Sequence, residues 1–252
     1  MTNKTNSKVT RVQPIFNWLK KSKISDWAQI LVDMSEGLNH KLKCGTVIDV
    51  VVNLEKTVPA SPTRLAWMLR NAERLRPNSE RSCEELKKRM ANHVAVSAAL
   101  SKLEKETGVV ALPRGLSLES STHADCLIEC EKVFIWIEGK RFDRLSFSTK
   151  WDKTRDQLAR NLEAVQRLAQ AEGKDYCLLI CHEHDLNDRE QKLVQGYRTG
   201  KLINGCPHIS TEIRREFSQR IGMVMWQDIA CKWTGLQALS QLADLGKKKE
   251  EQ

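Results

Sequence analysis

The sequence has no long hydrophobic run, few cysteines and none of the common nucleotide-binding signatures. No stretch approaches the roughly 18 consecutive apolar residues that a membrane helix requires, and the longest candidates, 47–54 and 133–137, have the length of strands. Eight cysteines in 252 residues are too few for a disulfide scaffold. A secretory signal region, a Gly-rich phosphate loop and a Ser-His-Asp arrangement are also absent. We therefore expect no contact with a membrane, no ATPase activity, and a cytoplasmic protein with reduced thiols.

Positive charge is what the sequence has in excess. It contains 41 Lys and Arg against 32 Asp and Glu, a formal net charge of +9, which favours a polyanionic partner. The first 25 residues contain six basic residues and no acidic one. Such a segment is typical of a flexible arm that faces nucleic acid, and also of a mitochondrial transit peptide. We favour the arm.

The composition and the apolar pattern predict a globular chain with four segments. Forty per cent of the residues are hydrophobic and seven are Trp, enough to bury a core. Apolar residues recur at helical spacing before about residue 107, and compact β-branched runs follow. The predicted segments are a basic flexible arm (1–13), a mainly helical region (14–107), a core (108–246) and a charged tail (247–252).

The predicted core is an α/β fold in which a mixed sheet is flanked by helices. Its short runs of β-branched, aromatic and other apolar residues predict strands, and its longer periodic segments predict helices. The run at 47–54 fits either a strand or a buried helical turn. The predicted strands are 126–130, 133–140, 176–181 and 221–226, and the predicted helices are 152–172, 210–220 and 236–245.

The candidate chemistry lies on a predicted hairpin. If the chain turns at Glu131-Lys132, a loop of even length places Asp125 directly opposite Glu138, whereas an odd length would shift the pair to a diagonal. Directly opposed residues on one face have Cβ atoms about 5 Å apart. Lys140 lies on the same face as Glu138, roughly 7 Å further along the strand. The less specific alternative is that Glu138 and Lys140 form an ordinary exposed pair on an edge strand.

Two opposed carboxylates suit a divalent cation. Mg²⁺ prefers one or two protein carboxylates and keeps positions for water and substrate phosphate. The carbonyl oxygen of Gly139 would be a further oxygen ligand, and Lys140 could orient the attacking water or neutralise developing negative charge. The pattern therefore points to metal-assisted hydrolysis of a phosphodiester.

Asp125, twelve intervening residues and then Glu138-x-Lys140 resemble the motif of the PD-(D/E)XK nuclease superfamily, which has the restriction-endonuclease-like fold. The surrounding residues, including Trp151 and the Arg155–Arg160 segment, are similar to a bacterial branch of that superfamily whose role is poorly defined. The likeness spans roughly residues 60–230. One departure is visible, because Ala124 stands where the Pro of the name is usual.

This resemblance implies roles for individual residues. Asp125 and Glu138 would bind Mg²⁺, for which Mn²⁺ can substitute, and Lys140 would act on the water. Gln157 would lie near the active centre. Glu119 stands where the branch keeps an acidic residue, and we expect it either to touch the metal, directly or through water, or to face solvent. The expected basic rim for nucleic acid consists of Arg141, Arg155 and Arg160, although any one of them could simply be solvated.

The function implied is a Mg²⁺-dependent nuclease that acts on nucleic acid, with DNA favoured, in a bacterial cytoplasm. Defence against foreign DNA fits the general habits of the fold, and the oligomeric state stays open. One alternative is a binding module that keeps the nuclease fold without cleaving. Another is a zinc-stabilised protein, since Cys177, Cys181, His182, His184 and the Cys206-x-His208 pair are groups that zinc accepts. Their spacing is poor, because Cys177 and Cys181 would lie about 13 Å apart on a strand.

Overall fold

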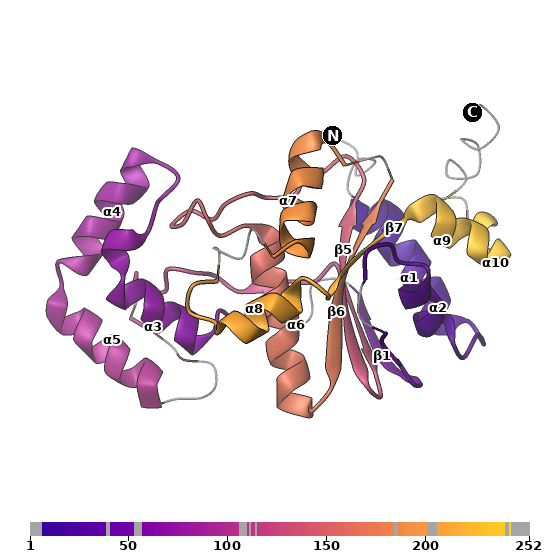
Figure 1. Cartoon of the computed structure of the whole chain (residues 1–252), viewed down its shortest axis with the longest axis horizontal. Helices are drawn as coiled ribbons and strands as arrows, with labels where there is room; N and C mark the ends of the chain where they lie inside the picture. Colours follow the sequence, from indigo (N-terminus) through magenta and orange to yellow (C-terminus); the bar gives the residue numbers. More distant parts are fainter. Residues whose placement is uncertain are drawn as a thin grey trace.

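The computed structural model describes residues 7–38, 41–52, 57–105, 110, 112–113, 115–183, 186–200, 206–239 and 242. At its centre is a five-stranded mixed sheet with the strand order β1-β4-β5-β6-β7 (Figure 1). The strands are β1 (Val47–Val52), β4 (Cys126–Cys130), β5 (Val133–Lys140), β6 (Asp175–His182) and β7 (Ile221–Met225). β1, β4 and β5 pair antiparallel, and β5, β6 and β7 pair parallel. The α/β class and the mixed sheet are therefore confirmed, and the ambiguous run at 47–54 contains a strand.

The central strand β5 is buried along its whole length, because helices cover both faces of the sheet. Its alternate residues enter two different cores. Val133, Ile135 and Ile137 belong to one apolar cluster, and Phe134 and Trp136 belong to the other. The residues at the carboxyl end of this central strand, after its apolar run, are therefore also shielded from solvent.

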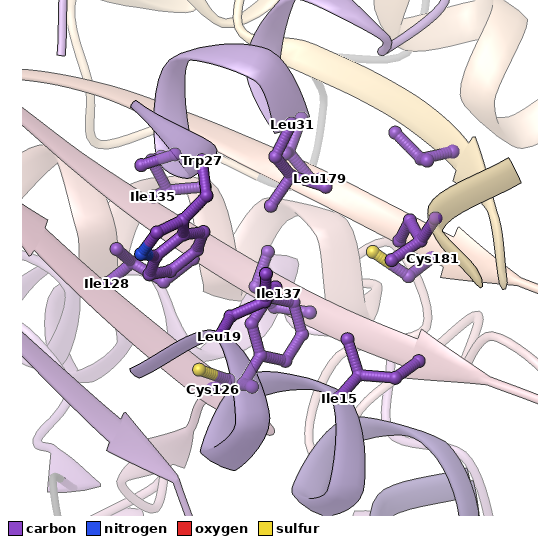
Figure 2. Packing of buried hydrophobic residues seen from close by; sticks show 14 of the residues in the cluster. Ile15, Leu19, Trp27, Leu31, Cys126, Ile128, Ile135, Ile137, Leu179 and Cys181 are labelled. Carbon is purple, nitrogen blue, oxygen red and sulfur yellow. The ribbon is translucent and has the colours of Figure 1, made fainter. Parts of the chain in front are cut away.

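Helices from the two ends of the chain cover one face of the sheet. They are α1 (Gln13–Lys21), α2 (Trp27–Asp33), α9 (Trp226–Lys232) and α10 (Thr234–Gln237). Ile15 and Leu19 of α1 pack with Trp27 and Leu31 of α2 onto β4, β5 and β6, as Figure 2 shows. A short π-helical segment, η2 (Lys8–Val12), precedes α1. This part of the N-terminal region is therefore integral to the sheet's core.

The opposite face is covered by α6 (Gln157–Glu172), α7 (Asp188–Arg198) and α8 (Thr211–Phe217). α6 begins where the Asp156 side chain accepts a hydrogen bond from the Ala159 N–H, and it ends at Gly173, whose φ of +64° is readily adopted by glycine. One side of α6 packs into the core through Leu158, Leu162 and Val165.

A helical lobe stands to one side of the sheet (Figure 1). It comprises α3 (Pro62–Arg70), the 3₁₀ turn η3 (Ala72–Arg74), α4 (Glu80–Met90) and α5 (His93–Lys105). The helices α3, α4 and α5 share an apolar cluster of their own. A two-stranded ribbon of β2 (Thr57–Val58) and β3 (Thr122–His123) lies near α6.

Several predicted boundaries were wrong. The supposed flexible arm at 1–13 is helical and packed from Lys8 onward, with Arg11 and Val12 fully buried, while residues 1–6 lie outside the described residues. The region 14–107 is not one unit, because α1 and α2 pack onto the sheet and β1 is one of its strands. The helix predicted from 152 begins at Gln157, and Trp226 starts α9 instead of ending β7. α7 was not predicted, and the tail at 247–252 lies outside the described residues.

Candidate functional site

The β4–β5 hairpin has the predicted register. Cys126 pairs with Ile137 and Leu127 with Trp136, so the turn lies at Glu131-Lys132 as expected. The backbone N–H of Asp125 donates to the Ile137 carbonyl at 3.2 Å. Asp125 is therefore the next residue along this ladder, beside Glu138 at the end of the apolar part of β5.

Glu138 is a buried carboxylate held by three side chains. It is 3% exposed. Its Oε1 lies 2.8 Å from Lys140 Nζ and accepts from Gln157 Nε2 at 2.7 Å, and its Oε2 accepts from Asn161 Nδ2 at 2.8 Å. Because buried charges need such partners, these contacts fix the carboxylate in one orientation. The alternative of an exposed edge pair is wrong, since β5 is central and both Glu138 and Lys140 are buried.

Gln157 is placed by the first turn of α6 and connects the lysine to the carboxylate. Its Oε1 accepts from the Ser146 N–H at 3.2 Å and from Lys140 Nζ at 3.4 Å, so its amide nitrogen must face Glu138. Asn161 lies one helical turn later on the same face. Asn161 was not predicted from the sequence, although its i+4 spacing from Gln157 indicates that the two side chains share a helix face.

Asp125 adds a second carboxylate to Glu138. Burial, followed by the negative charge of Glu138, raises the pKa of Asp125 from its ordinary value to about 7. The Gly139 N–H, which donates to Asp125 Oδ2 at 2.8 Å, opposes this shift in pKa, as do the charges of Lys140 and Lys8. The two acidic groups are therefore close enough to repel each other, and a bound cation would relieve that repulsion.

Gly139, between the two motif residues, allows a close approach of the chain. A Cβ at this position would lie 2.5 Å from a methyl group of Val12 and 3.3 Å from the Trp226 ring. Its carbonyl, the third predicted oxygen ligand, accepts a hydrogen bond from the Ser7 hydroxyl at 2.9 Å. The indole N–H of Trp226 donates to the Lys140 carbonyl at 3.1 Å. The N-terminal segment thus forms one wall of the site, which the sequence did not indicate.

The donor set fits a hard cation held by few protein ligands. Asp125, Glu138 and the carbonyl of Gly139 offer oxygen atoms at one edge of the sheet, and Mg²⁺ commonly uses one or two carboxylates and completes its shell with water. Among the described residues there is no group of three or more His, Cys, Asp or Glu side chains that could hold a metal ion. A zinc site of that kind therefore has no support in these residues.

The expectation that Glu119 faces solvent is wrong. Glu119 is buried, and its oxygens face Arg155 at 2.8 Å and Arg64 at 3.3 Å. Burial raises the pKa of Glu119, but these two arginines outweigh that effect and hold the pKa below its ordinary value. Glu119 therefore belongs to a buried ion-pair network with Arg64 and Arg155.

Arg155 is also interior, contrary to its predicted place on a basic rim. It is 1% exposed and lies between Glu119 and Glu163, 2.6 Å from the latter. The physical reason is that α6 starts after Arg155, so the residue turns inward from the preceding loop. Glu163 also contacts His208 Nε2 at 2.9 Å and the Ser61 hydroxyl. This buried network ties the helical lobe to the core.

The other basic residues near the site, Arg141, Arg144 and Arg160, each contact the protein itself but differ in how exposed they are. Arg160 donates to the carbonyls of Ser120 and Ser121 and its side chain is 24% exposed. Arg141 lies 3.1 Å from Glu183, which also pairs with Arg11. Arg144 is more open, with a side chain that is 64% exposed. Arg144 is therefore a better candidate for contact with a phosphate than Arg155.

The cysteines and histidines of the zinc alternative have other surroundings. Cys177 and Cys181 are fully buried in the core of β6, and burial raises the pKa of both thiols above the ordinary value. His208 pairs with Glu163, and His182 ends β6 in register with Lys140. His184 lies outside the described residues.

Comparison with protein-family models, with curated proteins and with solved structures found no match. The resemblance to the PD-(D/E)XK superfamily therefore stays a prediction that depends on the motif and its geometry. No described helix has both the length and the apolar character needed to cross a membrane.

Proposed function

We propose that this chain is a Mg²⁺-dependent nuclease that hydrolyses phosphodiester bonds in DNA. The observation that carries the proposal is the placement of Asp125 beside Glu138 with the ammonium of Lys140 2.8 Å from the Glu138 carboxylate. This arrangement buries an acidic pair and a lysine at a strand terminus, where the core does not require them. All eight cysteines are free thiols, which fits the reducing cytoplasm of a bacterium as the proposed location.

Each residue at the site has a role in this proposal. Asp125 and Glu138 would hold Mg²⁺, with the carbonyl of Gly139 as a third oxygen. When bound, Mg²⁺ supplies a positive centre for the phosphate oxygens and lowers the pKa of water. Lys140 holds the attacking water or a phosphate oxygen through its N–H donors. Gln157 keeps Lys140 and Glu138 oriented, because its amide contacts both.

A cleavage panel tests the proposal. Labelled single-stranded, duplex and branched DNA, and RNA of the same sequence, are incubated with the chain in Mg²⁺, Mn²⁺ or EDTA. We expect cleavage only with a metal, and a loss of at least about 10²-fold in Asp125→Asn and Glu138→Gln, the usual scale for removing one essential catalytic group. Asp188→Asn is the matched control, since Asp188 is an exposed acid in the first turn of α7.

Three outcomes would contradict the proposal. They are cleavage in EDTA, full activity in Asp125→Asn, or an equal loss in Asp188→Asn. Binding of DNA without cleavage in any metal would favour the non-catalytic binding module. Thermal unfolding of every variant separates a loss of chemistry from a loss of fold.

A further inference from the structure

A groove of about 860 Å³ lies at the carboxyl ends of β6 and β7, beside the candidate site. Its walls come from α7, from β7 and the start of α9, and from the segment that follows α2. The volume is within the range of small-molecule and nucleotide pockets, about 300–1,000 Å³.

This groove meets the candidate site at His182. In the sheet, His182 is the register partner of Lys140 on one side and of Met225 on the other. A smaller cavity of about 190 Å³ is lined by Lys140 and Arg144, and it shares His182 and Leu186 with the groove. A nucleic-acid strand with one phosphate at Lys140 would therefore pass His182 and enter the groove with its next nucleotide.

The two sides of the groove differ in chemistry. One side carries the thioethers of Met34, Met223 and Met225, which are polarisable and adapt to flat aromatic rings. The other side is the face of α7 that carries Gln191 and Gln195, at i and i+4. The Gln191 amide nitrogen already donates to the Leu186 carbonyl at 2.7 Å, whereas the exposed Gln195 lines the groove one helical turn later. A primary amide both donates and accepts hydrogen bonds, as the edge of a nucleobase does.

The charges in the groove nearly balance. Lys192 and Arg198 supply two positive groups, while Glu36 and Asp228 supply two negative groups. A channel for a run of phosphates would carry a clear positive excess, because backbone binding depends on neutralising charge. An apolar side, an amide side and balanced charge instead suit a base and its sugar.

We propose that this groove holds the nucleobase of an unpaired nucleotide next to the scissile phosphate. The inference depends on the proposed function and deepens it by naming the substrate as single-stranded or locally unpaired DNA. A base inside a duplex cannot enter such a groove without leaving the stack, which costs unpairing energy that a single strand does not incur. An unpaired base is free to contact the methionine side chains, and a contact between a thioether sulfur and an aromatic ring contributes about 0.3–1.5 kcal/mol.

Equilibrium binding in EDTA tests this inference without requiring cleavage. Fluorescence anisotropy is measured with a labelled single-stranded oligodeoxynucleotide and with the blunt duplex of the same sequence. We expect the single strand to bind more tightly, and Gln195→Glu to weaken its binding about tenfold, the effect of losing one well-held base. Gln170→Glu, at an exposed position on α6, changes the net charge equally and should bind like the wild type.

A photocrosslink provides a second measurement that does not depend on a variant's stability. A single strand that carries 5-iodouracil should crosslink to peptides from 191–198 or 223–225. Crosslinks only elsewhere, or unchanged binding by Gln195→Glu, would overturn the groove assignment even if the chain cleaves DNA. Groove crosslinks and a single-strand preference without cleavage in Mg²⁺ would overturn the proposed nuclease activity and support the groove.

Discussion

Replacing Arg155 with alanine should destabilise the fold while leaving the nucleic-acid affinity of the folded protein unchanged. The guanidinium is buried between the carboxylates of Glu119 and Glu163, at 2.8 and 2.6 Å. Alanine would leave two buried negative charges with weaker compensation. Removing one partner of a buried ion pair typically costs about 3–5 kcal/mol.

The lower end of this range applies, because neither carboxylate loses all of its partners. Glu119 keeps Arg64 at 3.3 Å, and Glu163 keeps His208 at 2.9 Å. We therefore expect a loss of about 3 kcal/mol in the free energy of unfolding. For a chain of this size that loss corresponds to a Tm lower by roughly 6–12 °C. It is a large share of the ~5–15 kcal/mol that stabilises a typical domain.

Arg144→Ala is the matched control, since Arg144 is mostly exposed, and its buried partner Glu190 keeps hydrogen bonds from the N–H groups of Leu145 and Asn187. That variant should lose no more than about 1 kcal/mol. It should instead reduce the slope of log Kd against log salt concentration by about one unit if Arg144 neutralises one phosphate. Urea unfolding and salt titrations of DNA binding, made on both variants, measure the two effects. A stable Arg155→Ala with a reduced salt slope would refute the assignment of Arg155 to the interior network.

Two further predictions concern Lys140 and Glu163. Lys140→Ala should slow cleavage at least about 10²-fold. Lys140→Arg should restore little activity, because a planar guanidinium cannot hold the water as an ammonium does. Full activity in Lys140→Arg would mean that the residue supplies only positive charge. Burial raises the pKa of Glu163, but the charge of Arg155 outweighs this and lowers the pKa below its ordinary 4.5. The stability from ionised Glu163 is therefore complete above pH 4.5 and is lost as the pH falls below it. The Tm of Glu163→Gln should be lower at neutral pH and should fall less steeply in acid, and parallel Tm–pH curves for wild type and variant would show the reasoning to be wrong.

The hairpin and its acidic pair could be predicted because they depend on local rules. An even turn at Glu131-Lys132 fixes which residues face each other, and alternation along β5 fixes the face of Glu138 and Lys140. Asn161 could also have been found, since it follows Gln157 by one helical turn. These inferences need only residues close together in sequence.

The roles of the basic residues could not be predicted, because they depend on partners far away in sequence. Arg11 lies in a segment that resembles a solvated arm, yet it is buried against Glu183, 172 positions later. Arg155 resembles a surface residue until its carboxylate partners Glu119 and Glu163 are known. The sequence gives the position of a positive charge but not its burial or its partner. For this reason Arg155 was wrongly predicted to lie on an exposed basic rim.

The position of β5 explains how distant segments reach one edge of the sheet. β5 pairs antiparallel with β4 and parallel with β6. On the antiparallel side, the neighbour of the end of β5 is the start of β4, which brings Asp125 to Glu138. On the parallel side, the neighbour is the end of β6, which brings His182 to Lys140. Because β5 has one antiparallel and one parallel neighbour, its carboxyl end lies between the acidic pair and the groove beyond His182. In the proposed function, this β-strand therefore places the metal-binding carboxylates next to the groove that would hold the adjoining nucleotide.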